Sequence, residues 1–455
     1  MIFEVIMDKV LKLITVAAAV LLCDAHASAI SGSWRGKLSL GQASLPLVFN
    51  FKADASGKTV CTMDSPSQGA KGIPVTVEIC TTDSIKVTCG AIGASYSGAV
   101  KDNVIKGQFV QRGYSFPLDL TAETSDRRPQ TPVPPFPYSV SDTVFTAADG
   151  AVMSATLTVP ANASSAKMPA VVMVTGSGPQ NRDEELFDHK PFAVIADYLA
   201  RNGIASLRYD DRGTGKSGGN FATATTVTFK DDAASAVDFL RTVGCVGKVG
   251  VLGHSEGGTI AFMLGAEGKA DFIISLAGMA ISGKETLMRQ NRHALESAGL
   301  PEDDKENSLK LIENLFDEII AQVAERLTAP IDIDKLAKDS GLEVPAQILS
   351  TLKMTQSTRS SWFDMFLALN PRDFIGKVKC PVLAINGDKD TQVSTDNLTL
   401  IKQLNPKART MLMTGLNHLM QHAITGEVSE YDDITETISP EVLQAIATFV
   451  TTASR

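Results

Sequence analysis

A serine flanked by two glycines is the feature of this sequence that most clearly suggests chemistry. Residues 253–257 read GHSEG and fit the pattern G-x-S-x-G, in which the glycines allow a strand to turn sharply into a helix. An apolar run at 248–252 precedes the pattern, and a run compatible with a helix follows at 259–267. On such a turn the serine is exposed, and the first N–H groups of the helix point toward its target. The sequence therefore predicts that Ser255 is a nucleophile.

A serine hydroxyl needs a histidine to accept its proton and a carboxylate to orient that histidine. On a sheet with helices on both faces, these groups lie on loops that follow later strands. The predicted base is His418, which follows an expected strand at 409–413, and the alternative is His422, about one helical turn further along. The other histidines that we considered are interpreted as packing, surface or interface residues: His254 beside the serine, His189 and His293.

The orienting carboxylate is expected in the sequence GDKD, directly after an expected strand at 382–386. Asp390 is the predicted partner of the histidine. Asp388 is the alternative, and its competing interpretation is a turn residue that binds its own backbone. Nucleophile, acid and base then follow three different strands in the order Ser255, Asp390, His418. Three motifs that follow three successive strands in this order are more specific than any one of the motifs alone.

Two backbone N–H groups are expected to stabilise the oxyanion that develops on a substrate. One belongs to Glu256, at the start of the helix after the serine. The other belongs to Ser177 in the sequence GSGPQ, which follows an expected strand at 170–175. Glycines in that loop allow its backbone to approach a substrate closely. A plain turn rich in Gly and Pro is the competing interpretation.

Residues 138–455 alternate apolar, strand-like runs with helix-like segments, which predicts a doubly wound, mostly parallel sheet with helices on both faces. The expected strands lie at 140–146 and 153–159 in an opening hairpin, then at 170–175, 204–209, 248–252, 272–277, 382–386 and 409–413. About a hundred residues between Gly278 and Cys380 lack a strand signal, and an insertion of that length is typically a functional lid. We predict a helical cap over about 279–375, and the alternative is a packing element at the sheet edge.

Three aromatic residues of this insertion, Trp362, Phe363 and Phe366, share the spacing of one helix face. We interpret them as a face buried against the sheet. The alternative is that they line a pocket for an acyl or aromatic group.

The first part of the chain divides into three segments that differ in composition. Residues 1–29 have the pattern of an export signal, with lysines before a short apolar run and small residues at the cleavage sites. Residues 30–125 contain short runs of branched residues separated by Gly, Asp and Ser, which predict a small antiparallel barrel or sandwich. Residues 126–137 carry five prolines and predict a semi-rigid linker.

The export signal predicts that the protein is periplasmic or secreted. Acylation of Cys23 to form a lipoprotein and a retained membrane helix are the alternatives, although the apolar run is too short for a comfortable transmembrane span. An oxidising compartment would permit a disulfide among Cys61, Cys80 and Cys89, with one cysteine left unpaired.

The composition argues against several classes of function. The chain has 51 acidic and 42 basic residues, a net charge of −9, and no stripe dense in Lys or Arg, which argues against a nucleic-acid partner. The sequence contains neither a C-x-x-C motif nor a His/Cys spacing typical of a metal site, so we expect no metal site. The sequence DDRGTGKS at 210–217 lacks the G-x-x-x-x-G-K-[ST] pattern of a phosphate loop, and we interpret it as a turn held by Arg212 and an aspartate. The sequence gives no oligomeric state.

With these motifs in view, residues 138–455 resemble the α/β-hydrolase superfamily, in particular its serine aminopeptidase-like branch and the two-domain bacterial carboxylesterases with an N-terminal β domain. The segments that carry the resemblance are TGSGPQNRDE (175–184), RYDDRGTGKS (208–217), GHSEGG (253–258), NGDKD (386–390) and GLNHLMQ (415–421). Thr175 stands where this branch often has a histidine, so no role of that histidine carries over.

The resemblance implies an acyl-enzyme mechanism without a cofactor. Ser255, His418 and Asp390 would cleave a small acyl ester, while the N–H groups of Ser177 and Glu256 hold the oxyanion. A peptidase, amidase or thioesterase with the same triad is the alternative, because the turn around the serine does not distinguish these enzymes. A third interpretation is a non-catalytic protein whose β domain binds a glycan or an envelope partner.

Overall fold

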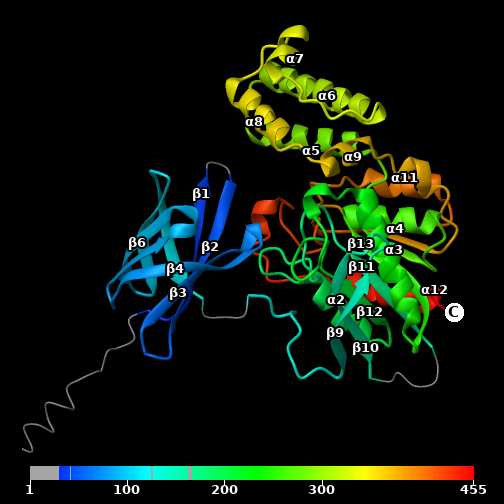
Figure 1. The fold of residues 1–455 in the computed structure, drawn as a ribbon, viewed down its shortest axis with the longest axis horizontal. Helices are drawn as coiled ribbons and strands as arrows, with labels where there is room; N and C mark the ends of the chain where they lie inside the picture. The colour runs from blue at the N-terminus through cyan, green and yellow to red at the C-terminus, as the bar shows by residue number, and fades with distance from the viewer. Residues whose placement is uncertain (1–29, 41–42, 124–126, 162–166) are drawn as a thin grey trace, which may run out of the picture. The chain divides into compact units, whose positions relative to one another are not determined.

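The described part of the chain forms two units. A computed structural model describes residues 30–40, 43–123, 127–161 and 167–455 (Figure 1). Its contacts divide the chain into a first unit that ends at Asp126 and a second that begins at Arg127. The predicted export signal, residues 1–29, lies outside the described residues and stays a prediction.

The first unit is a closed antiparallel barrel, in which each strand pairs with the next and β1 pairs with β8. Its strands and short 3-10 helices are β1 (Gly32–Leu40), β2 (Ala43–Ala53), β3 (Thr59–Ser65), η1 (Pro66–Gln68), β4 (Ala70–Cys80), β5 (Ser84–Cys89), η2 (Gly90–Ile92), β6 (Ala94–Lys101), β7 (Val104–Gln111) and β8 (Tyr114–Ala122). The unit is therefore a barrel and not the sandwich that was the other expectation. Large side chains such as Trp34, Phe49 and Tyr96 fill its interior.

The three cysteines of the barrel, Cys61, Cys80 and Cys89, are free thiols. Burial raises the pKa of Cys61 to about 12, so this thiol stays protonated and unreactive at neutral pH. The disulfide that an oxidising compartment would permit is not formed among these described residues.

The second unit is built on a sheet with the strand order β16-β15-β14-β13-β11-β12-β10-β9. The strands are β9 (Tyr138–Thr146), β10 (Val152–Pro160), β11 (Met168–Val174), β12 (Ala205–Tyr209), β13 (Val246–His254), β14 (Ile273–Leu276), β15 (Val382–Gly387) and β16 (Arg409–Met413). β9 and β10 form the expected antiparallel hairpin, and β11 to β16 are parallel. β12, β14 and β15 are buried throughout, because helices cover both faces. The structure confirms the predicted doubly wound, mostly parallel sheet.

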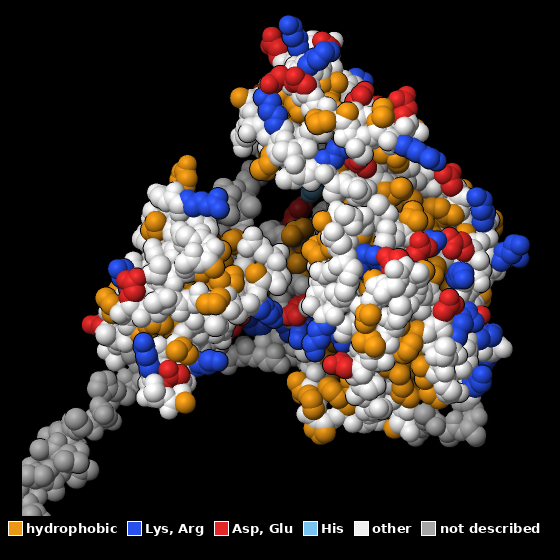
Figure 2. Space-filling view, in the orientation of Figure 1, with side chains coloured by type: hydrophobic (Ala, Val, Ile, Leu, Met, Phe, Trp, Pro, Cys, Tyr) orange, Lys and Arg blue, Asp and Glu red, His pale blue; other side chains and the backbone are white. Residues whose placement is uncertain are grey.

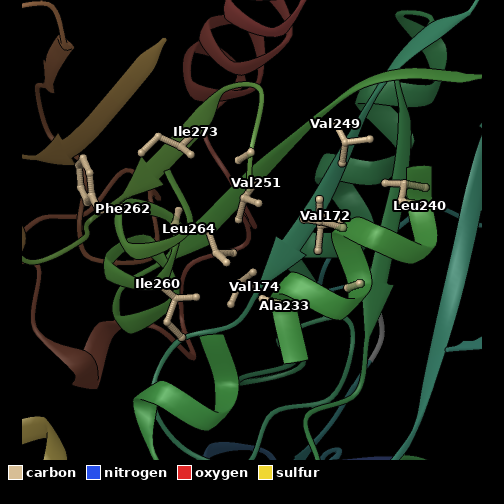
Figure 3. Packing of buried hydrophobic residues seen from close by; sticks show 14 of the residues in the cluster. Val172, Val174, Ala233, Leu240, Val249, Val251, Ile260, Phe262, Leu264 and Ile273 are labelled. Carbon is tan, nitrogen blue, oxygen red and sulfur yellow. The ribbon is translucent and has the colours of Figure 1, made fainter. Parts of the chain in front are cut away.

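Two apolar cores lie on the two faces of this sheet. Helices α3 (Thr226–Thr242), α4 (Glu256–Ala266) and α11 (Asp396–Leu404) pack on one face, and α2 (Pro191–Arg201) and α12 (Pro440–Ala453) pack on the other. Figure 3 shows part of the first core, where Val172 and Val251 of the strands lie among Ala233, Ile260 and Leu264 of the helices. The two cores hold the strand ends, and therefore the loops that follow them, in fixed positions.

Between β14 and β15 the chain forms the predicted helical insertion. Its helices are α5 (Gly283–Ser297), α6 (Glu302–Ala324), α7 (Ile333–Asp339), α8 (Ala346–Ser357), α9 (Ser361–Ala368) and α10 (Arg372–Ile375). Ser282 and Glu285 form a capping box that starts α5. Apolar residues such as Leu311, Leu315 and Phe316 give the insertion a core of its own, so helices α5 to α9 form a separate group beside the sheet (Figure 1).

The exposed surface of this insertion is mixed in charge. Acidic and basic side chains are interspersed over α6 to α8 (Figure 2), and ion pairs such as Lys353 with Asp334 join neighbouring helices. Exposed pairs of this kind add little stability, so the apolar core holds the insertion together. Within the described residues, we find no helix that is both long and apolar enough to cross a bilayer.

Candidate active site

Ser255 lies at the sharp turn between β13 and α4. Its backbone has φ 53° and ψ −118°, a conformation that is strained for a residue with a side chain. Two glycines allow the helix to pack directly on the strands. A Cβ at Gly253 would overlap the carbonyl group of Gly257, and a Cβ at Gly257 would overlap the carbonyl group of Val174 in β11. The turn therefore has the form that the sequence predicts.

This close packing gives a testable stability difference. We expect Gly257→Ala to lower the free energy of unfolding by about 3 kcal/mol or more, because β11 cannot yield without opening the sheet. Gly244→Ala is the matched control: a Cβ there meets nothing within 4 Å, so its effect should stay below about 0.5 kcal/mol. Urea unfolding followed by circular dichroism measures both, and equal stability of the two variants would contradict the packing described.

His418 and Asp390 lie together, as predicted. Nδ1 of His418 is 2.9 Å from Oδ2 of Asp390, and the two side chains are 5% and 0% exposed. The other oxygen of Asp390 accepts hydrogen bonds from the backbone N–H groups of Gln392 and Val393, both at 2.8 Å. These bonds fix the carboxylate independently of the histidine. Asp390 therefore presents one oxygen to the imidazole in a defined orientation.

The alternative acid and base have other partners. Asp388 accepts a hydrogen bond from the backbone N–H of Gly415 at 2.6 Å, which joins two loops. His422 is 55% exposed and binds Glu436 at 2.9 Å. It pairs with Leu416 in an isolated β-bridge, so the expectation that it lies one helical turn beyond His418 is wrong. These contacts favour Asp390 and His418 over their alternatives.

Ser255 and His418 line the same cavity, which has a volume of about 220 Å³. Ser177 also lines it, from the loop after β11. A Cβ at the neighbouring Gly176 would lie 3.2 Å from Cβ of Ser255, so this loop is in contact with the serine. Glu256 is the first residue of α4. The structure thus brings the predicted nucleophile, the predicted base and residues 176–180, which we call the oxyanion loop, to one cavity, and Asp390 contacts His418 from outside the cavity lining.

The side chain of Glu256 is a part of the site that the sequence analysis did not consider. It is 2% exposed, and its carboxylate accepts hydrogen bonds from the Thr226 hydroxyl at 2.6 Å and from the Trp362 indole N–H at 2.9 and 3.0 Å. Burial raises the pKa of Glu256, and these donors and the Ser177 side chain oppose the increase. The residue after the serine therefore connects the oxyanion loop, the start of α3 and helix α9 of the insertion.

Aromatic side chains of α9 form one part of the cavity wall. Trp362 and Phe366 line the cavity together with Met279, and the two aromatic rings are 5.1 Å apart. Phe363 instead packs inside the insertion against Phe316. The interpretation as one face buried against the sheet is therefore wrong for Phe363. Phe366 is buried and packs with Val393, and Trp362 packs against the same cluster, so these two residues both face the sheet unit and line the cavity.

Another part of the wall joins two segments that are far apart in the sequence, around His189 and at 431–437. Nδ1 of His189 is 3.0 Å from the Thr437 hydroxyl, and Nε2 is 3.1 Å from the carbonyl oxygen of Tyr431. His189 is 1% exposed, so it is not the surface residue that was one expectation for it. Burial and the charge of Arg128 lower the pKa of His189 to about 3, so its ring stays neutral.

Arg128, in the segment predicted to be a linker, anchors this wall. Its guanidinium donates to the carbonyl oxygen of Phe187 at 2.7 and 3.0 Å and to that of Ile434 at 2.8 Å. Two residues further on, the Gln130 side chain donates to the carbonyl oxygen of Ile438 at 2.8 Å. Arg128 and Gln130 are therefore structural parts of the second unit.

The turn at 210–217 is structural, in agreement with its interpretation from the sequence. Arg212 forms ion pairs with Asp232 and Asp149. The carboxylate of Asp211 accepts hydrogen bonds from the Thr175 hydroxyl at 2.8 Å and from the backbone N–H of Gln180 at 3.0 Å, which fastens the oxyanion loop. In the described ranges, we find no group of three His, Cys, Asp or Glu residues that could hold a metal ion.

Comparisons with known proteins add family relationships to this geometry. The family model described as X-Pro dipeptidyl-peptidase (S15 family) matches residues 149–422. Esterase EstD of Thermotoga maritima is 30% identical over 270 residues, which make up 58% of this chain and 56% of that protein. An acyl transferase of Shewanella hanedai is 31% identical over 120 residues, or 26% of this chain and 38% of that protein. The chain thus matches little more than half of the first relative's length.

Solved structures of esterases are also similar to this chain. The Pyrococcus furiosus esterase Pf2001 has a TM-score of 0.43 and 16% sequence identity, and the match covers 70% of this chain and 92% of that one. Est1E from Butyrivibrio proteoclasticus has a TM-score of 0.41 and 16% identity, with coverage of 69% of this chain and 98% of that one.

Proposed function

The chain belongs to the X-Pro dipeptidyl-peptidase (S15) family, and we propose that it is a serine hydrolase that cleaves carboxylic esters through an acyl-enzyme intermediate. The observation that carries the proposal is the position of His418, which binds Asp390 at 2.9 Å and lines the same cavity as Ser255 and Ser177. The 30% identity to an esterase supports the choice of bond.

The proposed reaction follows from this arrangement. The Ser255 hydroxyl attacks the ester carbonyl while Nε2 of His418 accepts its proton, and Asp390 stabilises the resulting imidazolium. The backbone N–H groups of Ser177 and Glu256 donate to the oxyanion of the tetrahedral intermediate. His418 then protonates the leaving alcohol, and a water molecule, activated by the same histidine, hydrolyses the acyl-enzyme and restores Ser255.

The charges in the cavity favour a neutral ester over a peptide with a free N-terminus. A dipeptidyl-peptidase must bind the ammonium group of its substrate, for which a carboxylate is the usual partner. Among the described residues that line the cavity, Glu184 is the only acidic one. Its Oε1 already accepts hydrogen bonds from His254 at 2.9 Å and from the backbone N–H of Gly176 at 2.7 Å. The cavity therefore offers an ammonium group poor compensation for its lost hydration.

The helical insertion serves as the cap of this site. Trp362 and Phe366 of α9 present an apolar wall to the cavity, which suits an acyl chain. The bond between the Trp362 indole and the buried Glu256 carboxylate holds α9 beside the turn that carries the nucleophile. Together with the volume of about 220 Å³, this wall fits a small acyl ester.

A fluorophosphonate probe and a substrate panel test the proposal with the full chain. We expect the probe to label Ser255, and p-nitrophenyl esters of short acyl chains to be hydrolysed much faster than Ala-Pro p-nitroanilide or an acyl thioester. If the probe labels Ser255 but the anilide or the thioester is hydrolysed faster than the esters, the protein is a peptidase, amidase or thioesterase and not an esterase. Absence of labelling and of turnover would support a non-catalytic binding protein instead.

A further inference from the structure

His254, next to the nucleophile, occupies a buried position that the proposed reaction does not use. It is 7% exposed, and its ring centroid lies 4.8 Å from that of His418. Its Nδ1 is 2.9 Å from Oε1 of Glu184, and its Nε2 is 2.9 Å from the backbone carbonyl oxygen of His418. One imidazole therefore connects the loop after β11 with the loop that carries the proposed base.

Both partners of this ring are hydrogen-bond acceptors. A carbonyl oxygen can only accept, so Nε2 must carry a proton, and an ionised carboxylate can only accept, so Nδ1 must carry one as well. Oε1 of Glu184 also accepts the backbone N–H of Gly176 at 2.7 Å, so this oxygen serves as an acceptor for two N–H groups. The geometry therefore fits a buried imidazolium paired with a carboxylate. A neutral imidazole carries a single N–H and could donate to only one of the two acceptors.

The charged groups that face the ring also favour its protonated form. Glu184 and Asp390 are carboxylates on two different loops, and His418 is the titratable neighbour. Asp211 faces Glu184 from a third loop, where burial raises the pKa of Asp211 well above its ordinary value, so it is not counted among the charges that stabilise the ring. Burial by itself lowers the pKa of His254. The charge and hydrogen bond of Glu184, with further contributions from the His418 carbonyl and Asp390, outweigh burial and raise this pKa above its ordinary value.

We propose that the ion pair of Glu184 and His254 is a positioning element of the catalytic centre, in which His254 works as a protonated imidazolium. The pair fixes the oxyanion loop through the N–H of Gly176 and the base loop through the carbonyl group of His418. This inference rests on the proposed hydrolase function, since only that function gives the two loops their roles.

NMR of the full chain labelled with ¹⁵N-histidine tests the protonation state directly. The sequence contains six histidines, so the ring signals can be separated, and the His254→Gln variant assigns the one of interest. We expect both ring nitrogens of His254 to carry hydrogen at about pH 7.5, where an unperturbed histidine is mostly neutral. A neutral tautomer at that pH would overturn the proposal. The measurement needs no turnover, so its failure is distinct from failure of the hydrolase function.

The pH dependence of the activity has a definite sign. Because the pKa of His254 is raised on folding, the stabilisation that the pair provides is complete below the ordinary value of 6.5 and is lost as the pH rises through the folded value. We therefore expect kcat to fall on the alkaline side as His254 loses its proton. In Glu184→Gln this alkaline limb should move to lower pH by about one unit or more, because a neutral amide no longer stabilises the imidazolium.

A pair of matched variants tests the positioning role. Glu184→Gln keeps the size of the side chain and an acceptor for Gly176, and we expect kcat to fall roughly 10- to 100-fold with little change in KM. Glu427→Gln is the control, because Glu427 pairs with His293 at 2.8 Å where both side chains are about two-fifths exposed, and its kinetics should not change. If Glu184→Gln kept full kcat and an unmoved alkaline limb, the pair would contribute packing alone and the proposal would be refuted.

Discussion

Replacing Ser255 by alanine is expected to lower kcat for p-nitrophenyl esters by about 10⁴- to 10⁶-fold, because the hydroxyl that is proposed to form the acyl-enzyme is lost. The fold should persist, since alanine meets the same backbone strain at φ 53° as serine does. Steady-state kinetics on enzyme free of contaminating esterases measures the loss. Probe labelling of the same variant reports on the nucleophile independently of substrate choice.

A serine elsewhere provides the control for this substitution. Ser235 is on helix α3, where its hydroxyl donates to the carbonyl oxygen of Asp231 at 3.0 Å, so Ser235→Ala should keep full activity and full labelling. Thermal unfolding of both variants checks that they are folded. If Ser255→Ala retained activity within a factor of ten of the unmodified chain, Ser255 would not be the nucleophile, and the proposed mechanism would be wrong.

The second large effect is expected from Asp390→Asn, which should lower kcat by about 10⁴-fold. An amide in place of the carboxylate can donate to Nδ1 of His418, which favours the tautomer with its proton on Nε2, where Ser255 needs an acceptor. The amide also cannot stabilise the imidazolium. Its oxygen can still accept from the N–H groups of Gln392 and Val393, so the loop should keep its conformation.

Asp388→Asn is the matched control for this prediction, because Asp388 lies two residues away and was the alternative acid. An amide oxygen there can still accept from the N–H of Gly415, so we expect kcat to change by less than about threefold. The pair of variants separates the two carboxylates in one experiment with p-nitrophenyl esters. A large loss from Asp388→Asn with little loss from Asp390→Asn would assign the orienting role to Asp388.

The strands and helices of the second unit could be predicted because each carries a strong local signal. β11 and β15 are continuous apolar runs, as parallel strands covered on both faces must be. The barrel was predicted less completely, because only some of its strands combine branched residues with alternating buried and exposed positions. In β5, for example, Ile85 and Val87 are buried while Lys86 between them is exposed. Strands such as β1 and β6, with small and polar residues in their sequences, gave no comparable signal.

The predicted triad depended on motifs that each lie within a few residues of a strand end. The contacts that support the triad instead join residues that are far apart in the sequence. Trp362 reaches Glu256 across 106 positions of the sequence, and Glu184 reaches His254 across 70. A long-range pair of this kind is created by packing, so neither residue carries a local pattern that reveals its partner. The expectation of a helical turn at His422 was wrong for the same reason, because the partner of His422 is Glu436, fourteen residues away.

The contacts of Arg128 have a consequence for where this protein can be divided. Proline content places the boundary at 126–137, which suggests trimming the second unit to the start of β9 at Tyr138. Such a cut would remove the guanidinium from the carbonyl groups of Phe187 and Ile434 and leave buried acceptors without donors. A fusion that exchanges the barrel for another module should therefore keep the native chain from Arg127 onward, because without Arg128 the cavity wall formed by His189 and residues 431–437 loses its anchor far from the junction.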